Sequence, residues 1–504
     1  MRKRRVGLHV LALATPAVCL GLMTASCGGK PEAPASQAGG ELLVLCGAGI
    51  RPPMEELKAA FEKENNCTVS VNYAGSGTLL GQLQSGAEAD VYVPGDVAYI
   101  KAGQGKDLIA SAKVLAWFVP VLAVQKGNPK GVKGLADLAR TDLEVGLGQP
   151  DACAVGGVAR DLLKAARLAD RVKPDFEALT VNRLANQVKL KSLDVALIWD
   201  ATAAQYTDSI DVVPVEDANF HAVPFAAGIT KNAPNADLAA RFADFAAGDA
   251  GADVFRRHHY TVPGKEIRVG CGSSFRPVIE ELIARFQSAY GVEAKPNYGG
   301  SGTVLLQIEE AGEGDIYVCH DPYAKICEAK DLSAAWHTMA YIAPTIAVKR
   351  GNPKNVKGLM DLLRDDIRVG LPERETSTRG RVLWAIFKKQ GVADKMTAHG
   401  FVEDRTHALV NKLLLDAVDV AVLWDAPTKA MEEIEAVPIE EKYQVDSVTS
   451  ATGKTYPVDR LHVTVVRLNV SKEPLLAAQF AKLCLSPVGR DVLKRHKFTL
   501  PPAP

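Results

Sequence analysis

The chain has 504 residues, of which 47% are hydrophobic and 23% charged, and its 59 basic side chains balance 59 acidic ones. This length predicts more than one domain. A net charge of zero argues against a nucleic acid as partner, because binding to phosphates needs an excess of basic groups. After the first thirty residues, no run approaches the roughly 20 consecutive apolar residues of a membrane span.

The N-terminal residues have the pattern of a secretion signal. Basic residues at positions 2–5 precede a short apolar stretch, and small residues then lead to Cys27. We predict a lipoprotein signal peptide over residues 1–27, with Cys27 as the acylated residue that anchors the chain on the extracytoplasmic face of a membrane. Ordinary cleavage near Ser26 is the alternative. The Gly-, Pro- and Ala-rich residues 28–40 predict a flexible tether.

The rest of the chain is a long repeat. Several segments recur in the same order at nearly constant separation. They are Leu42–Pro52 with Ile267–Pro277, Gly75–Thr78 with Gly300–Thr303, Gly127–Pro129 with Gly351–Pro353, and Asp194–Asp200 with Asp419–Asp425. A period this long indicates duplication of a whole globular module. We predict modules at residues 41–264 and 265–504, with a polar insertion in the second from Glu441 to Tyr456.

Each module begins with an apolar strand, a loop and an amphipathic helix, which we expect at Met54–Glu64 and Val278–Tyr290. Strands and helices then alternate, which predicts an α/β fold with mostly parallel sheets and helices on both faces. The long apolar stretches Val114–Val124 and Thr338–Val348 have the character of strands that cross from one lobe to another. We therefore expect two α/β lobes around a ligand cleft in each module, with ligands at the carboxyl ends of the strands.

The repeated Gly-Ser-Gly-Thr turn is the most informative local pattern. A strand-like segment runs into Gly75-Ser76-Gly77-Thr78 in one copy and into Gly300-Ser301-Gly302-Thr303 in the other. Glycines allow close approach of a ligand to the backbone, and the N-terminus of a following helix attracts anions. We expect those helices at Leu79–Ser85 and Val304–Ala311. The alternative is that each serine only caps its helix.

The seven cysteines after Cys27 do not predict a disulfide framework. Only Cys46 and Cys271 correspond between the copies, whereas a duplicated framework would repeat both members of each pair. We interpret most of them as small buried residues. No cysteine or histidine spacing suggests a metal site, and no cofactor is expected.

Both copies resemble the type II periplasmic substrate-binding proteins, and in particular the molybdate- and tungstate-binding components of ABC importers. The resemblance rests on the first-strand loop, the Tyr-x-Gly-Ser-Gly-Thr turn, and the apolar strand that ends in Trp199-Asp200 and in Trp424-Asp425. It implies that a first-loop serine and the turn serine bind an oxyanion. It also implies a third contact near Cys153–Val155 and near Ser377–Gly380.

Carried onto this sequence, the resemblance assigns candidate ligand-binding residues to both modules. In the first module they are Gly49, Ser76, Gly77, Asn182 and Asp200. In the second they are Ser273, Ser274, Ser301, Gly302 and Asp425. For the two aspartates, a hinge or helix-capping role is the alternative to contact with the ligand.

These observations predict a tethered extracytoplasmic protein that captures molybdate or tungstate and delivers it to an ABC permease. We do not expect an enzyme, because neither copy has a recognisable catalytic set or P-loop. Alternatives are binding of sulfate or another anion, or an anion sensor or scaffold with one degenerate module. Because Gly49 stands where the second copy has Ser274, we expect the first module to bind the metal oxyanion more weakly or with different selectivity.

Overall fold

The computed structural model describes residues 40–502, apart from residues 373–376, 404–405, 444–445, 451–452 and 458–459. The predicted signal peptide, the acylation site Cys27 and nearly all of the predicted tether lie outside the described residues.

The first lobe of the first module is built on a five-stranded sheet in the order β2-β1-β3-β10-β4. The strands are β1 (Glu41–Gly47), β2 (Thr68–Ala74), β3 (Val91–Val93), β4 (Ile109–Phe118) and β10 (Val223–Thr230). Strand β1 runs parallel to both β2 and β3, whereas β10 is antiparallel to its neighbours β3 and β4. The helices of this lobe are α1 (Arg51–Asn65), α2 (Ser76–Gln84), α3 (Val97–Gln104), α8 (Ala236–Ala247) and α9 (Asp249–Arg257).

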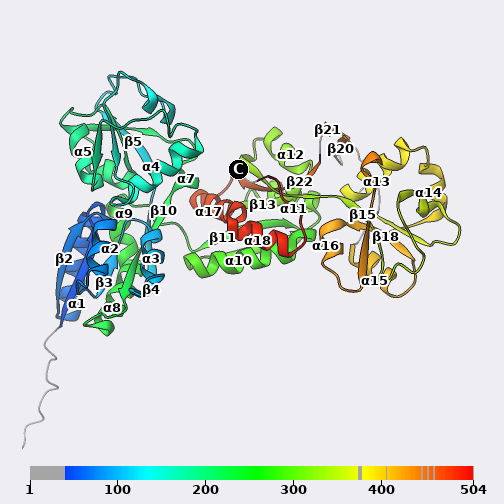
Figure 1. Ribbon diagram of the computed structural model, residues 1–504, viewed down its shortest axis with the longest axis horizontal. Coiled ribbons are helices and arrows are strands. Elements are labelled where there is room, and N and C mark those ends of the chain that lie inside the picture. The colour runs from blue at the N-terminus through cyan, green and yellow to red at the C-terminus, as the bar shows by residue number, and fades with distance from the viewer. Residues whose placement is uncertain are drawn as a thin grey trace, which may run out of the picture. The chain divides into compact units, whose positions relative to one another are not determined.

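The second lobe has a sheet of the same design, in the order β7-β6-β8-β5-β9. Its strands are β5 (Pro120–Gln125), β6 (Val145–Gly148), β7 (Phe176–Ala178), β8 (Val195–Trp199) and β9 (Ile210–Pro214). Its helices are α4 (Ala154–Ala165), α5 (Val181–Lys189), α6 (Asp200–Ala203) and α7 (Ala218–His221). The two lobes of the module are seen as separate groups of elements in Figure 1.

The second module repeats this architecture strand for strand. Its first sheet has the order β12-β11-β13-β22-β14 and its second the order β17-β16-β18-β15-β19. The first sheet consists of β11 (Glu266–Gly272), β12 (Glu293–Gly299), β13 (Ile316–His320), β14 (Ser333–Ile342) and β22 (Leu461–Leu468). The second consists of β15 (Pro344–Lys349), β16 (Val369–Pro372), β17 (Gly400–Glu403), β18 (Val420–Trp424) and β19 (Ile434–Pro438). The predicted tandem α/β fold with two lobes in each module is confirmed. The prediction of mostly parallel sheets is wrong, because two of the four strand pairings in each five-stranded sheet are antiparallel.

The helices of the second module follow the same order, except that α14 is added and α7 has no helical counterpart among the described residues. They are α10 (Arg276–Tyr290), α11 (Ser301–Ala311), α12 (Tyr323–Ala329), α13 (Thr378–Lys389), α14 (Ala393–His399), α15 (Thr406–Leu414), α16 (Asp425–Lys429), α17 (Pro474–Leu485) and α18 (Pro487–Arg495). The predicted polar insertion contributes the small hairpin of β20 (Ser447–Thr449) and β21 (Thr455–Pro457), which contacts α13.

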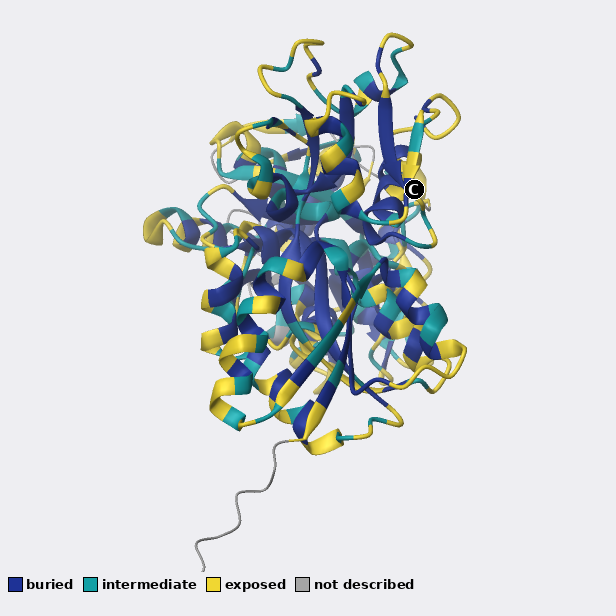
Figure 2. Cartoon of the chain, turned by 90° about the vertical axis from the view of Figure 1, so that its left-hand side faces the viewer, coloured by how far each residue is buried: buried dark blue, intermediate teal, exposed yellow. Residues whose placement is uncertain are grey.

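Burial follows from the apolar pattern of the strands. In Figure 2 the strands are largely dark blue, whereas the helices alternate between buried and exposed residues. Strand β8 is buried along its whole length because helices cover both faces of the sheet. Helix α1 buries only one side, which includes Met54, Leu57 and Phe61. Burial of this apolar surface is the main force that holds each lobe together.

The first crossing between the lobes of each module falls within the predicted apolar stretch, where a single residue separates two strands, and β10 and β22 return the chain to the first sheet. The crossing lies at Val119 between β4 and β5, and at Ala343 between β14 and β15. Asp200 accepts a hydrogen bond from the Val119 N–H, and its own N–H donates to the carbonyl of Val119. Asp425 makes the same pair of bonds with Ala343. Both aspartates therefore hold the hinge.

The two modules are joined by a short connection with its own hydrogen bonds. The Gly264 N–H donates to the carboxylate of Glu473 at 2.8 Å. Arg467 makes a bidentate ion pair with Asp217, and the Gln479 amide donates to the carbonyl of Asn219 at 2.7 Å. These bonds tie α7 of the first module to α17 and β22 of the second.

Three further expectations concern the described part of the chain. The seven cysteines there form no disulfide, and all but Cys67 are buried, which agrees with a packing role. Within the described residues, no group of side chains has the composition of a metal site. Among those residues we also find no helix whose length and apolar character would let it span a membrane.

Candidate functional site

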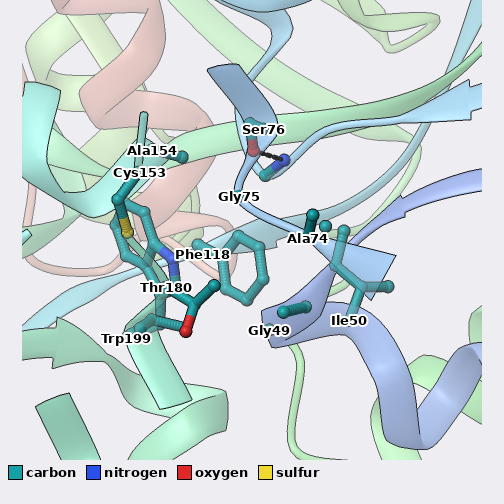
Figure 3. Close-up of a pocket in the computed structure, with 14 residues that line it drawn as sticks. Gly49, Ile50, Ala74, Gly75, Ser76, Phe118, Cys153, Ala154, Thr180 and Trp199 are labelled. Carbon is teal, nitrogen blue, oxygen red and sulfur yellow. Dashed lines mark hydrogen bonds between the residues drawn. The ribbon is translucent and has the colours of Figure 1, made fainter. Parts of the chain in front are cut away.

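The cleft of the first module contains a small cavity of about 20 Å³. Segments from both lobes line it, and Figure 3 shows Gly49, Ser76, Cys153 and Thr180 among the lining residues. The first-strand loop contributes Gly49, the Gly-Ser-Gly turn contributes Ser76, and the start of α5 contributes Thr180 and Val181. Aromatic side chains close the cavity, with Phe118 stacked on Trp199 at a ring-centre distance of 4.9 Å. The structure thus brings together the first loop and the turn serine, as the sequence predicts.

Ser76 does not cap its helix. Helix α2 begins at Ser76, three residues earlier than predicted, and Gly75 is the N-cap residue. The Ser76 Oγ instead accepts a hydrogen bond of 2.9 Å from the Gly95 N–H, drawn in Figure 3, so its own hydrogen remains available to donate. Ser301 does not cap its helix either, because it is the first residue of α11 and follows the N-cap residue Gly300. The capping interpretation is therefore wrong for both serines.

The two lobes of the first module contact each other across this cleft. The Gly77 N–H donates to the carbonyl of Ala152 in the opposite lobe at 3.1 Å. A side chain at Gly77 would have its Cβ only 1.9 Å from the Asp151 carbonyl oxygen, and one at Gly75 would lie 2.4 Å from that of Leu179. Glycine at these positions is required by the close approach of the lobes. The Gly77 N–H therefore donates its hydrogen bond to the opposite lobe, whereas we expected it to face a ligand.

Gly49 is packed too closely to be replaced by a serine without a shift. A Cβ at Gly49 would lie 2.9 Å from Cγ1 of Val181 and 3.9 Å from Oγ1 of Thr202. The Thr202 hydroxyl is buried and has no hydrogen-bond partner. The Gly49 carbonyl accepts a hydrogen bond from the Tyr260 hydroxyl, which fixes the loop. In this cleft the missing first-loop hydroxyl is thus replaced by close packing and by a nearby threonine.

The lining of the first cavity carries no ionised side chain among the described residues. Its polar groups are backbone amides, the hydroxyls of Ser76 and Thr180, the thiol of Cys153 and the indole N–H of Trp199. Burial raises the pKa of the Cys153 thiol to about 11, which keeps it neutral. The cavity therefore offers neutral hydrogen-bond donors and no carboxylate acceptor.

Two predicted residues of the first module lie beside the cavity rather than in its lining. Asn182 follows Val181 in α5, and its Oδ1 is buried without a hydrogen-bond partner. Asp200 uses one carboxylate oxygen for the Val119 N–H and the other for the Thr261 hydroxyl. Burial raises the pKa of Asp200 to about 6. This geometry favours the hinge role for Asp200 over contact with a ligand.

In the second module the turn serine again faces the first loop. The Ser301 side chain is 6% exposed, and its Oγ has no hydrogen-bond partner. It lies 2.8 Å from the position that a Cβ at Gly272 would occupy, next to the loop that carries Ser273 and Ser274. Ser274 is half-buried, whereas Ser273 is exposed. The Asp425 carboxylate accepts a hydrogen bond from the Ala343 N–H at the hinge and pairs with Lys429 at 2.9 Å.

The lobes of the second module meet through side chains instead of backbone. The Tyr323 hydroxyl lies 3.4 Å from both the Thr378 hydroxyl and an Nη2 atom of Arg381. A Cβ at Gly302 would lie 2.8 Å from the same tyrosine oxygen. Arg381 also donates to the carbonyl of Thr449 in the inserted hairpin. Tyr323 therefore joins the start of α11 to the start of α13 across the cleft.

Two ionisable residues in this region are not among the candidates predicted from the sequence. Arg379, at the second position of α13, is 3% exposed, and its Nη1 donates to the Thr406 hydroxyl at 3.1 Å. Its Nε has no partner. Burial lowers the pKa of Arg379 to about 10, so the guanidinium stays charged at neutral pH. His320, at the end of β13, contacts the rings of Tyr323 and Trp424.

A signal for these two residues is present in the sequence. When the two repeats are aligned, His320 corresponds to Gly95 and Arg379 corresponds to Val155. At both positions the residue differs between copies whose flanking segments are similar. The prediction of site residues relied on residues that recur in both copies, so it passed over these two. The Asn182 counterpart, His407, has a side chain outside the described residues.

Two α/β lobes that close on a small polar cleft define a class of protein that binds a solute, and the tandem modules are those of type II periplasmic binding proteins. The chain belongs to the family described as bacterial extracellular solute-binding proteins, whose model matches residues 42–261 and again residues 267–499.

Individual relatives match about half of the chain. The molybdate-binding protein ModA of Mycobacterium tuberculosis H37Rv is 26% identical over 52% of this chain and all of its own length. The putative ABC transporter substrate-binding lipoprotein YvgL of Bacillus subtilis is 23% identical over 48% of this chain and 94% of its own. Among solved structures, the periplasmic molybdate-binding protein of Azotobacter vinelandii is similar to 44% of this chain at 18% identity, with a TM-score of 0.39.

Proposed function

We propose that this protein captures molybdate or tungstate outside the cytoplasm and delivers it, without chemical conversion, to an ABC permease. The observation that carries the proposal is the first cavity, where the turn serine, the first loop and the start of α5 meet between lobes that contact each other. The names of the molybdate-binding relatives agree with it. Acylation at Cys27 would keep the protein beside the permease.

The neutral lining explains why a fully ionised anion fits. An oxyanion without a proton needs only donors, which the Ser76 hydroxyl and backbone amides supply. A phosphate ion at neutral pH carries a proton that needs an acceptor, and the described lining has no carboxylate for it. Sulfate is also free of protons, so it is the nearest competitor and must be distinguished by size. An anion sensor or scaffold would use the same cleft without a permease.

The test is calorimetric titration of the purified protein with molybdate, tungstate, sulfate and phosphate. We expect binding of molybdate or tungstate, and a loss of about ten- to hundredfold in affinity for Ser76→Ala, because a hydrogen bond to a charged ligand contributes about 1.5–3 kcal/mol. Ser85→Ala is the matched control, since this hydroxyl lies at the other end of the same helix and bonds to Gly81. Binding of sulfate or an organic acid, but of neither metal oxyanion, would contradict the proposal.

A further inference from the structure

The second cleft has polar side chains at three matched positions where the first has none, and one of them is charged. Where the first module has Gly95, Ala154 and Val155, the second has His320, Thr378 and Arg379. In the first module these positions are already close together, because a Cβ at Gly95 would lie 3.2 Å from Cβ of Ala154 and 3.6 Å from Oγ of Ser76. The substitutions therefore fall together at the cleft, beside the turn serine.

Arg379 is a buried cation with unused hydrogen-bonding capacity. Among the described residues, its only hydrogen bond runs from Nη1 to the Thr406 hydroxyl, and none of their carboxylates pairs with it. A buried charge without a counter-ion is costly, so the position calls for an anion. The planar guanidinium can present Nε and Nη2 together to two oxygens of a tetrahedral or planar oxyanion.

A second buried donor lies on the opposite lobe. The Ser301 hydroxyl is also without a partner, at the N-terminus of α11. The Tyr323 oxygen connects the two donors, since it lies near Gly302 on one side and 3.4 Å from the Thr378 hydroxyl, next to Arg379, on the other. Two unpartnered polar groups from facing helix starts thus converge on one cleft.

His320 adds a group that the first cleft lacks, a neutral acceptor. Its Nδ1 lies 2.9 Å from the carbonyl oxygen of Asp321, which accepts hydrogen bonds only, so Nδ1 carries the proton. Burial lowers the pKa of His320, and the charges of Arg381 and Arg379 lower it further. In the neutral ring, Nε2 then has a free lone pair and can accept a hydrogen bond from a ligand.

We propose that the second cleft binds a different class of ligand from the first: a tetrahedral oxyanion that keeps a proton at neutral pH, with inorganic phosphate as its simplest member. Arg379 and Ser301 donate to the ionised oxygens, and His320 Nε2 accepts the hydrogen bond of the protonated one. A fully ionised sulfate or molybdate would turn an oxygen lone pair toward that nitrogen and be disfavoured. The protein would then hold two kinds of oxyanion at once. This proposal replaces the expectation that the first module binds the metal oxyanion more weakly, because that expectation counted only the hydroxyl missing at Gly49 and not the buried Arg379 of the second cleft.

The experiment is calorimetric titration of the full protein with phosphate, sulfate and glycerol 3-phosphate, with and without saturating molybdate. We expect phosphate to bind at one site, at least about tenfold more tightly than sulfate, and with an affinity that molybdate does not change. Glycerol 3-phosphate, whose phosphate group is largely unprotonated at neutral pH, should bind more weakly than phosphate, and tighter binding would contradict the need for a proton. No binding of phosphate, equal affinity for sulfate, or competition with molybdate would overturn the proposal.

Variants assign the site to the second cleft. Arg379→Gln should weaken phosphate binding by about ten- to hundredfold, whereas Arg368→Gln, an exposed arginine of the same lobe paired with Asp419, should not. His320→Phe retains a ring in the aromatic cluster but removes the acceptor, so it should abolish the preference for phosphate over sulfate. If Arg379→Gln does not fold, the His320→Phe selectivity decides. Loss of phosphate binding in Ser76→Ala would place the ion in the first cleft and refute the proposal.

Discussion

The two clefts share one scaffold and differ in what closes them. In the first module the lobes meet through backbone, with Gly77 bonded to Ala152, and the described lining is uncharged. In the second they meet through Tyr323 and Thr378, with a buried Arg379 beside them. Duplication kept the strand order and the turn serine, while changes at a few positions on the cleft face altered the charge. If the two clefts bind different ions, as we propose, ligand class is set by the cleft-facing loops and not by the sheets that carry them.

The largest expected effect comes from adding one methyl group between the lobes of the first module. In Gly77→Ala the Cβ would overlap the Asp151 carbonyl oxygen at 1.9 Å, so the lobes must move apart. We expect molybdate affinity to fall by about a hundredfold, because so short a contact with backbone should cost the upper end of the overpacking range, about 3 kcal/mol. Titration calorimetry measures it.

Gly302→Ala is the matched control in the second module. There the Cβ would meet only the end of the Tyr323 side chain at 2.8 Å, which can move. A Gly302→Ala variant that lost phosphate binding as fully as Gly77→Ala loses molybdate binding would contradict the difference between the two closures.

The turn serines should show an effect of intermediate size, each on its own ligand. Ser301→Ala removes a buried donor, so phosphate binding should weaken by about ten- to hundredfold while molybdate binding stays unchanged. Ser76→Ala should weaken molybdate binding and leave phosphate binding unchanged. Calorimetric titration of both variants with both ions measures all four effects. If either substitution weakened both ions equally, the clefts would not be independent.

A smaller effect is expected when the first loop is made to resemble that of the second module. Gly49→Ser places its Cβ 2.9 Å from Cγ1 of Val181. The affinity gained from the added hydroxyl should therefore be offset by the cost of this steric overlap. We expect molybdate affinity to stay the same or to fall by up to about tenfold. Adding Val181→Ala to make room should restore it. A clear gain in affinity from Gly49→Ser alone would show that the missing serine limits this cleft.

The smallest effect on binding is expected at the hinge, where Asp200→Asn should change molybdate affinity by less than about threefold. The variant should instead alter how stability depends on pH. Because burial raises the pKa of Asp200 to about 6 in the folded protein, the fold favours its protonated form. The free energy of unfolding should therefore decrease by about 2–3 kcal/mol as pH rises from about 4 to above 6.

Denaturant unfolding at several pH values measures this dependence, which Asp200→Asn should remove. Asp425→Asn is the matched change in the second module, where Lys429 pairs with the carboxylate. A large loss of molybdate binding in Asp200→Asn would return Asp200 to the ligand-binding role.

The fold was predictable because its signals are repeated and periodic. The matched segments gave the duplication, and the apolar stretch before Gly127 located the strands β4 and β5 on either side of the hinge at Val119. The helix starts at Ser76 and Ser301 were missed by three residues, because a Gly-Ser-Gly-Thr sequence favours a turn as readily as a first helical turn.

The sites were predictable only in part. The sequence located Ser76 and Gly49 in one cavity, since both follow strands that lie side by side. It did not show that the Gly77 N–H is used between lobes, because that bond depends on how far the lobes close. Arg379 and His320 were not singled out, because burial without a partner is visible only in three dimensions.

The most direct test of the central claim is a crystal of the protein grown with molybdate and phosphate together, with data collected where molybdenum scatters anomalously. The account predicts one strong anomalous peak in the first cleft, within hydrogen-bond distance of the Ser76 hydroxyl and the first-loop amides near Gly49. It also predicts a tetrahedral ion without an anomalous signal beside Arg379 and Ser301. A molybdenum peak in the second cleft, or none in the first, would contradict it.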